Sequence, residues 1–520
     1  MSTTKIERPS LVKSTSVISA FTILSRILGF IRDILIAKFF GATLVAEAFF
    51  VSFRIPNLLR NLIGEGSVNA AVVPVLSEYA QQKNKEEFAL VSNMLMVLAF
   101  IILSILTLAG VIFAPVIVRL IAPGFMQDSY RLQLTIRLTR IMFPYLLFIG
   151  LTACSMGILH SQKSFFSSAV GPCLLNISII AGSILAANTM QEPVYGLAAG
   201  VLVGGLLQLI IQLPYLKRIG FAFKKIRSFA HPAIQQIRRL LIPRLFGSAV
   251  YQLNIFVDTM CSSLSYFCGF GAVAAIYYAN RIVQLPLAVF GIALASAVLP
   301  SLSRLAEENT AELRKTIQFC LKSILLVMVP STFALCILAQ PVIQTLFQRG
   351  SFDSYATAVT ASALFFYALG LCAYGGLKIM ISSFHALKDT KTPVRAAALG
   401  LAINIVLNIV LMRSMKVAGI ALASSIAATI QCSLLLCWMS KRIGTIIDRG
   451  LVVYFLRLVL IAAVMGGAVA ALWYNLCVGI QVMIRLPLVV ILGCGSFIGL
   501  CLLVGGEEKK ILTSWISKRK

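Results

Sequence analysis

The chain has 520 residues, of which 59% are apolar and only 12% are charged, and its mean hydropathy is +0.93. Soluble domains contain about 45–50% apolar residues, so this composition excludes an ordinary soluble protein and indicates a polytopic membrane protein. The net charge of +27 is not spread evenly and is concentrated in basic loops. No nucleic-acid-binding module is recognisable, and we expect no nucleic-acid partner.

Apolar stretches long enough to cross a bilayer recur along the whole chain. At about 20 residues per span, the sequence predicts fourteen transmembrane helices, near residues 16–40, 44–63, 88–121, 133–158, 167–188, 194–216, 236–262, 270–298, 316–347, 356–385, 394–412, 417–439, 451–475 and 484–505. The first apolar stretch contains arginines and lacks a small-residue cleavage site, so we expect no removable signal peptide.

Metal and cofactor sites are not expected. The twelve cysteines lie mostly within apolar spans and form neither a CxxC pair nor a Cys/His cluster, so they are interpreted as small hydrophobic residues. His160, His231 and His385 are scattered and carry no catalytic signature, and we interpret them as structural.

The basic loops predict the orientation of the chain. Lysine and arginine gather in the segment 217–244, in 388–395, at 441–442 and in the C-terminal tail, whereas the alternate loops are poor in lysine. Under the positive-inside rule the basic loops face the cytoplasm. An even number of spans then places both termini in the cytoplasm as well.

An internal repeat divides the chain into two lobes. Residues 71–80 (AVVPVLSEYA) return as 297–306 (AVLPSLSRLA), an offset of 226, and the sequence around His160 returns around His385, an offset of 225. The apolar spans that follow His160 and His385 both carry asparagine, at Asn176 and at Asn404 with Asn408. Because the offset covers about six spans, we expect lobes related by an axis along the membrane normal, as in transporters built of parallel repeats.

The predicted fold class is therefore an all-α polytopic membrane protein with two pseudo-symmetric six-helix lobes and two additional C-terminal helices. A basic connector, interpreted as an amphipathic helix on the cytoplasmic membrane surface and interrupted at Pro232, joins the lobes. The expected parts are an N-terminal lobe, the connector, a C-terminal lobe, two extra helices and a basic cytoplasmic tail, at residues 14–218, 219–235, 236–442, 446–506 and 507–520.

Arginines inside the predicted spans are the strongest indication of function. Arg26, Arg32, Arg54, Arg60 and Arg281 lie in otherwise apolar stretches. A guanidinium near the middle of a bilayer is disfavoured by at least about 2.5 kcal/mol, so such residues normally face a polar cavity or a partner. The sequence predicts a basic, water-filled cavity.

Two of these arginines have acidic neighbours that offer an alternative. Arg32 adjoins Asp33, which could partly neutralise it, and Arg60 could pair with Glu65. For these positions, a structural ion pair and contact with a substrate both remain open.

Several long motifs carry a resemblance to a known family. They are FTILSRILGFIRDILIAKFFGA at 21–42, AEAFFVSFRIPNLLRNLIGEGSVNAAVVPVLSEY at 46–79, YYANRIVQLPLAVFGIALASAVLPSLS at 277–303 and FHALKDTKTPV at 384–394. With them the chain resembles the MurJ/MviN family of bacterial lipid II flippases, within the superfamily of multidrug, oligosaccharidyl-lipid and polysaccharide exporters. The resemblance covers both lobes but not the last two spans.

The resemblance implies site residues. Arg26, Arg32, Arg60 and Arg281 match the family's required arginines, which line a central cavity and bind the headgroup of the substrate. Lipid II carries a pyrophosphate, and arginine provides forked, charge-assisted hydrogen bonds to phosphate oxygens better than lysine does. The accessory or gating positions that it implies are Asp33, Glu47, Arg54, Asn57, Glu65, Asn280 and Gln284.

The chain departs from the family pattern at three of these positions. Glu47 replaces the usual aspartate, and Asn280 and Gln284 stand at positions that are commonly acidic. Two negative charges are therefore missing beside Arg281, which we expect to leave it more available to an anion. Glu47 could gate the outward side by pairing with a basic residue, or it could be a solvated helix end.

The expected function is a flippase that moves lipid II from the cytoplasmic to the outer leaflet of the bacterial inner membrane by alternating access. No catalytic residues are expected, and the chain has no GxxxxGK[ST] loop that would make ATP the direct driver. The expected partners are lipid II, membrane lipids and cell-wall synthesis proteins.

Three alternatives stay open. The chain could flip another polyprenyl-linked saccharide, or it could be a cation-coupled exporter of the same superfamily, although cationic drugs would favour carboxylates in the cavity. A membrane enzyme acting on polyprenyl phosphate would need acidic metal-binding or catalytic pairs such as DDxxD at the membrane surface, and the sequence has no DDxxD motif.

Overall fold

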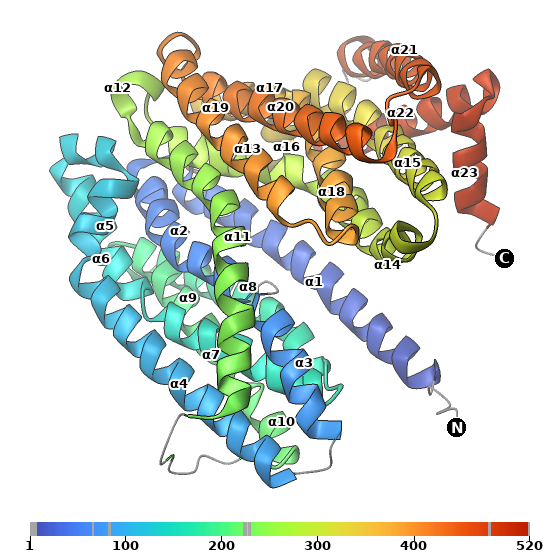
Figure 1. Ribbon diagram of the computed structural model, residues 1–520. Helices are drawn as coiled ribbons and strands as arrows, with labels where there is room; N and C mark the ends of the chain where they lie inside the picture. The colour runs from blue at the N-terminus through green and yellow to red at the C-terminus, as the bar shows by residue number, and fades with distance from the viewer. Residues whose placement is uncertain are drawn as a thin grey trace. The chain divides into compact units, whose positions relative to one another are not determined.

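The computed structural model describes residues 8–64, 67–81, 85–221, 226, 230–476 and 480–517 (Figure 1). Every secondary-structure element in these ranges is a helix, which confirms the predicted all-α fold class. Internal contacts divide the chain into two compact units, Met1–Gln252 and Leu253–Lys520. The two units are described separately.

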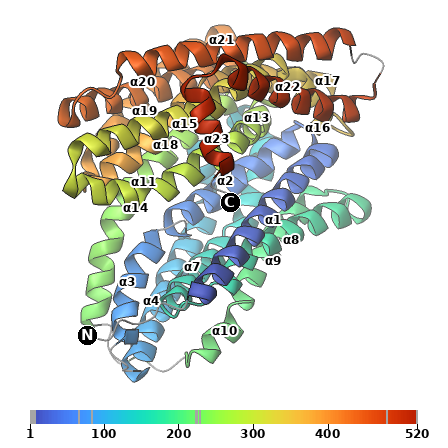
Figure 2. The same cartoon turned by 90° about the vertical axis from the view of Figure 1, so that its right-hand side faces the viewer.

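The first unit consists of helices joined by short turns. Its elements are α1 (Arg8–Phe40), α2 (Leu44–Gly64), α3 (Ser67–Gln81), α4 (Lys85–Ile112), α5 (Ala114–Ile121), the 3₁₀ turn η1 (Pro123–Gln127), α6 (Ser129–Met142), α7 (Tyr145–Ser161), α8 (Phe166–Thr189), α9 (Val194–Ile210) and α10 (Leu213–Arg218). Helix α1 packs against α8 (Figure 2).

Helix α11 (Pro232–Ser263) contains the boundary between the units. It is followed by α12 (Ser265–Cys268), α13 (Ala272–Pro286), the π-helical η2 (Leu287–Ile292), α14 (Ala293–Glu308), α15 (Thr310–Ile337), α16 (Ala339–Phe347), α17 (Ser354–Leu369), α18 (Leu371–Ala386), α19 (Lys391–Met415), α20 (Val417–Ile443), α21 (Arg449–Ala471), the π-helical η3 (Leu472–Leu476), α22 (Val482–Val504) and α23 (Glu507–Ser517).

Most of the predicted spans are helices of membrane-crossing length. Among the described residues, ten helices are long and apolar enough to cross a bilayer, or eleven when the bent pair of α17 and α18 is counted as one span. The predicted spans at 16–40, 44–63 and 236–262 are helical but are not in this set. All three carry arginines. The count of fourteen stays a prediction.

Proline and glycine divide several predicted spans into two helices. The stretch 88–121 becomes α4 and α5, with proline in the first turn of α5. Pro144 separates α6 from α7, and α17 and α18 meet at Gly370 with a bend of 47°. Proline lacks a backbone N–H and clashes with the preceding turn, so a helix tends to restart there.

The predicted connector and the predicted C-terminal tail both contain helical residues. Residues 222–225 and 227–229 of the predicted connector lie outside the described residues. Pro232 is the first residue of α11, a position at which its missing N–H is harmless. The predicted basic tail begins as helix α23, whose Glu507 forms an ion pair with Lys322 of α15.

Helices that correspond through the sequence repeat pack in corresponding pairs. Helices α3 and α7 pack together in the first unit, as do α14 and α18 in the second, and the pairs α8–α9 and α19–α20 also correspond. The turns after α7 and α18 match in their backbone conformation. Lys163 and Lys388 have φ of 59° and 58°, and their N–H groups donate to the carbonyls of His160 and His385 at 3.0 and 2.9 Å.

Close helix packing accounts for a glycine that the sequence places inside a span. On Gly204 of α9, a Cβ atom would lie 2.9 Å from the Cα of Leu175 on α8. The two backbones approach so closely that only glycine fits, as is common between membrane helices.

Many of the exposed side chains are large and apolar, for example Leu108 and Leu185 at 62% and 65% exposure. Such a surface is appropriate for contact with lipid.

Candidate substrate-binding arginines

Arg32 of α1 is buried and held by two side chains. Its Nε and Nη2 donate to Asp33 Oδ1 at 3.0 and 2.8 Å, and its Nη1 donates to Asn176 Oδ1 on α8 at 2.9 Å. Arg32 and Asp33 are 6% and 1% exposed. Of the two alternatives for Arg32, the structure has the ion pair with Asp33.

Asn176 extends this arrangement along α1. Its Nδ2 donates to the backbone carbonyl of Ser25 at 3.0 Å, so one amide bridges two separate turns of α1. We call Arg32, Asp33, Asn176 and Ser25 the Asp33 network. It fixes α1 against α8 through polar contacts inside an apolar helix pair.

Arg26 and Arg60 are less buried than Arg32. Arg26 is exposed on α1, six residues before Arg32. Arg60 is half-buried on α2, and its Nε donates to Asn57 Oδ1 at 2.9 Å. Arg54 is also half-buried. Glu65, the expected partner of Arg60, lies outside the described residues.

Glu47 forms a buried ion pair. Arg131 of α6 donates from Nη2 to Glu47 Oε2 at 2.5 Å, and the two side chains are 2% and 0% exposed. The guanidinium carbon of Arg131 lies 3.5 Å from the centroid of the Phe125 ring, a cation–π contact. Glu47 is therefore paired with a basic residue and is not a solvated helix end.

Arg281 lies half-buried on α13 of the second unit. Its guanidinium carbon is 5.7 Å from the centroid of the Tyr277 ring. The two residues at commonly acidic positions bond each other, because Gln284 Nε2 donates to Asn280 Oδ1. Their side chains thus contribute neutral amide dipoles to the surroundings of Arg281 where carboxylates would contribute negative charge.

The second unit contains a polar cluster of which the sequence had singled out only the two asparagines. Asp258 of α11 accepts from Asn408 Nδ2 and from the Ser424 hydroxyl, both at 2.9 Å. Asn404 donates to Ser424 Oγ at 3.2 Å and accepts from Asn408 Nδ2 at 3.0 Å. We call these four residues the Asp258 network.

The repeat contained the signal for this cluster. Asp258 follows Asp33 by 225 residues, the offset of the repeat. An asparagine belongs to each cluster: Asn176 of α8 accepts from Arg32, and Asn408 of α19 donates to Asp258. The Glu47–Arg131 pair had no such signal, because its members are 84 residues apart and nothing in the pattern links them.

The arginines therefore fall into two kinds. Arg32 and Arg131 are buried in ion pairs within the first unit. Arg26 is exposed, and Arg60 and Arg281 are half-buried. A guanidinium with accessible donors can form forked hydrogen bonds to phosphate, so the second kind is chemically suited to an anionic ligand.

Comparisons with known proteins identify the family. The model of the family "Lipid II flippase MurJ" matches residues 36–487. The chain is 36% identical to the lipid II flippase MurJ of Burkholderia cenocepacia over 88% of this chain and 89% of that protein. It is 33% identical to the probable lipid II flippase MurJ of Vibrio cholerae over 96% and 97%.

Solved structures give the same result. A lipid II flippase MurJ in an inward closed conformation superimposes with a TM-score of 0.79 at 27% identity, covering 94% of this chain and 98% of that one. An inward-facing MATE family transporter shares the fold, with a TM-score of 0.66 at 15% identity over 81% and 94%. Two membrane-embedded repeats, arginines in apolar helices and likeness along almost the whole length place this chain in the lipid II flippase MurJ family.

Proposed function

We propose that this chain flips lipid II, the undecaprenyl-pyrophosphate-linked disaccharide-pentapeptide, from the cytoplasmic to the outer leaflet by alternating access. The observation that carries the proposal is the family likeness over residues 36–487, which includes Arg60 of the first unit and Arg281 of the second. Flipping breaks no covalent bond, so the protein acts as a transporter and not as an enzyme.

The proposed headgroup ligands are Arg26, Arg60 and Arg281. Each is exposed or half-buried, and each lies in a helix in which most residues are apolar. A pyrophosphate offers several anionic oxygens, and the guanidinium fork can bind two of them at once. Asn57 is proposed to orient Arg60 through their hydrogen bond of 2.9 Å.

Arg32 is proposed to have a conditional role. Its Nη1 is occupied by Asn176, so it reaches a phosphate only in a state in which the phosphate replaces the amide. While no substrate is bound, Asp33 orients the guanidinium of Arg32 and balances its positive charge. Glu47 and Arg131 hold α2 against α6, and we assign Glu47 to the gate on the outward side.

The proposed topology places the basic loops, the connector and both termini in the cytoplasm of a bacterial inner membrane. The lysine and arginine bias supports this orientation. Anionic lipid headgroups on that side would attract the same loops. Cell-wall synthesis proteins are the proposed protein partners, because they supply and consume the lipid-linked precursor.

Complementation tests the function directly. The chain is expected to restore growth and outer-leaflet lipid II in bacteria depleted of their own flippase. Arg26→Ala, Arg60→Ala and Arg281→Ala should each lower lipid II accessibility by about 10- to 100-fold, the effect of losing one charge-assisted hydrogen bond. Lysine at these positions should restore part of the activity.

The matched control is Arg119→Ala, which removes an exposed arginine from α5 outside the proposed set. It should flip lipid II normally. Normal lipid II accessibility in all three alanine variants, at wild-type levels of membrane insertion, would contradict the proposed headgroup ligands.

A further inference from the structure

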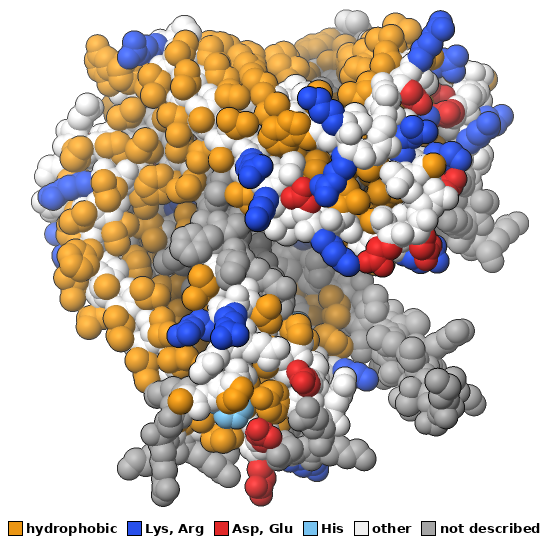
Figure 3. All heavy atoms as spheres, in the orientation of Figure 1, with side chains coloured by type: hydrophobic (Ala, Val, Ile, Leu, Met, Phe, Trp, Pro, Cys, Tyr) orange, Lys and Arg blue, Asp and Glu red, His pale blue; other side chains and the backbone are white. Residues whose placement is uncertain are grey.

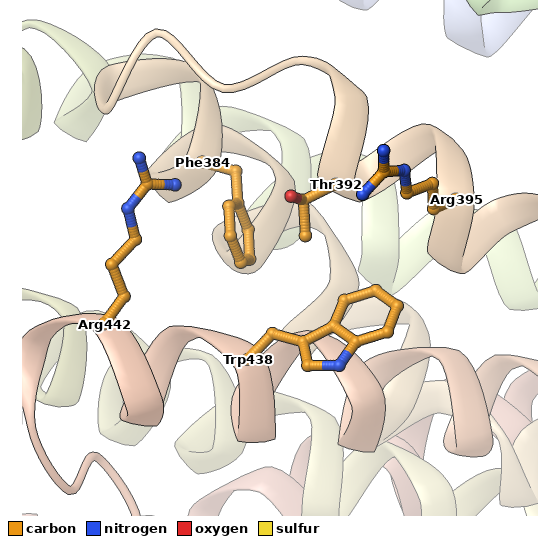
Figure 4. A pocket seen from close by; sticks show the side chains of 5 residues that line it. All are labelled: Phe384, Thr392, Arg395, Trp438 and Arg442. Atoms are coloured by element: carbon orange, nitrogen blue, oxygen red, sulfur yellow. The ribbon is translucent and has the colours of Figure 1, made fainter.

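A pocket of about 330 Å³ lies in the second unit where α18 ends, α19 begins and α20 ends. Its lining comprises Phe384 of α18, Thr392 and Arg395 of α19, and Trp438 and Arg442 of α20. Figure 4 shows the two arginines on opposite sides of the pocket, with the Trp438 ring below them and Phe384 and Thr392 between them. None of these residues belongs to the proposed headgroup ligands.

Hydrogen bonds fix one wall of this pocket. Asp389, in the turn before α19, accepts from Arg442 Nη1 at 2.7 Å and from the Thr392 hydroxyl at 2.8 Å. Burial alone would raise the pKa of Asp389, but the hydrogen bonds from Thr392 and Arg442 outweigh it and hold the pKa below its usual value. The carboxylate stays ionised at neutral pH and orients Arg442.

The groups that remain available in the pocket are hydrogen-bond donors. They are the rest of the Arg442 fork, the indole N–H of Trp438 and the guanidinium of Arg395, which has no hydrogen-bond or ion-pair partner among the described residues. Two cationic forks and an indole donor around one hollow favour an anion with several oxygens, such as a phosphate.

The exposed face of α19 sets the depth of the pocket in the membrane. Along this helix Arg395, Leu399, Val406, Val410 and Arg413 are all exposed, and they recur at helical spacing, so they form one stripe. The stripe is apolar between its two arginines. Eighteen residues separate these arginines, or about 27 Å along a helix, close to the roughly 30 Å of a hydrocarbon core.

We propose that this pocket binds the phosphate of an anionic membrane phospholipid. The apolar stripe is the lipid-facing side of α19, and Arg395 at its end lies at the level of the headgroups. Trp438 has the amphipathic ring that is enriched at this level. Figure 3 shows charged side chains gathered on the part of the visible face where α14 and α18 lie in Figure 1.

A phospholipid is favoured over a soluble anion because the pocket adjoins the lipid-facing stripe. Basic pockets between transmembrane helices are known binding places for anionic headgroups. The inference does not depend on the flipping of lipid II, since it concerns residues outside the headgroup ligands and is measured by lipid binding alone.

The test is lipid binding to the purified full-length protein by native mass spectrometry. The probes are phosphatidylglycerol and phosphatidylcholine with the same acyl chains. Arg395→Gln should weaken phosphatidylglycerol binding at the tightest site about tenfold and leave phosphatidylcholine unchanged. Arg395→Lys should lose less, because it keeps the charge but not the fork. Trp438→Leu should also weaken binding.

The matched control is Arg413→Gln, which removes the same charge from the opposite end of the same stripe, where no lining residue of the pocket lies. It should bind phosphatidylglycerol as the wild type does. Equal losses in Arg395→Gln and Arg413→Gln would overturn the proposal in favour of diffuse charge attraction. Displacement of phosphatidylglycerol by millimolar inorganic phosphate would reassign the pocket to a soluble anion.

Discussion

The Asp33 network and the Asp258 network occupy equivalent places in the two units but hold their carboxylates differently. In the first unit Arg32 forms an ion pair with Asp33 and bonds Asn176. In the second unit the hydrogen bonds described for Asp258 come from an amide and a hydroxyl. The residue that corresponds to Arg32 by the repeat offset is Val257.

The comparison shows which groups the two repeat-related networks share and which group differs between them. Both units have a carboxylate, on α1 or α11, and an asparagine on a partner helix, α8 or α19. Asn176 accepts from Arg32, whereas Asn408 donates to Asp258. Of the two networks as defined above, the Asp33 network contains a guanidinium. A buried ion pair depends on both of its members, because removing one leaves an uncompensated charge. The amide and hydroxyl that donate to Asp258 are neutral, so the loss of these two hydrogen bonds leaves no charge on the donors.

The largest effect is expected for Asp33→Asn. The substitution leaves the guanidinium of Arg32 buried beside a neutral amide, which should lower the free energy of unfolding by about 3–5 kcal/mol. Denaturant titration of the purified protein in detergent measures this loss. The double variant Arg32→Gln, Asp33→Asn should recover much of it, because no charge is then stranded. An Asp33→Asn variant as stable as the wild type would remove the basis of the comparison.

A smaller effect is expected for Asp258→Asn. The amide keeps one oxygen acceptor for Asn408 or Ser424, and the loss should be about 1–3 kcal/mol, the penalty of one unsatisfied polar contact. The same titration applies. Asn408→Ala is the companion variant, since it removes the donor and leaves the carboxylate. A larger loss of unfolding free energy in Asp258→Asn than in Asp33→Asn would contradict the comparison.

The smallest effect is expected from pH at the two matching turns. Asp389 follows Lys388, and Ser164 follows Lys163 at the equivalent place. Because the pKa of Asp389 in the folded chain lies below its usual value of about 3.9, its stabilisation of the turn is present above that value. It is lost as pH falls through the lower, folded pKa.

Amide hydrogen exchange, corrected for its intrinsic pH dependence, measures this difference. Between pH 6 and pH 3, protection should fall around residues 384–392 and stay constant around 159–167. In Asp389→Asn the two turns should respond alike. A parallel loss of protection in both turns of the wild type would point to general acid unfolding and away from Asp389.

The sequence predicted the helical architecture because hydropathy and span length determine it in a bilayer. The repeat offset also predicted that α7 corresponds to α18. The left-handed lysines that follow both helices were not predicted and come from the structure. The sequence did not predict the breaks at Pro144 and Gly370, where a continuous apolar stretch restarts as a new helix.

The arginine site was predictable only in part. The sequence identifies every arginine in an apolar span. The burial of each arginine side chain and its hydrogen-bond partners depend on which helices pack together. Asp33 adjoins Arg32 and was recognisable as its partner. Asn176 and Arg131 are 144 and 84 residues from the groups that they bond, and only the packing of α1 on α8 and of α2 on α6 brings these groups together.

The distance between the two arginines that end the stripe of α19 also makes this helix sensitive to the thickness of the bilayer. With Arg395 and Arg413 about 27 Å apart along the helix, both can reach headgroups only in a bilayer of nearly that thickness. A thicker membrane would have to thin locally and a thinner one would be met by tilt of α19, each at a modest energy per ångström of mismatch. The lipid composition of the membrane can therefore change the resting tilt of this helix without any ligand.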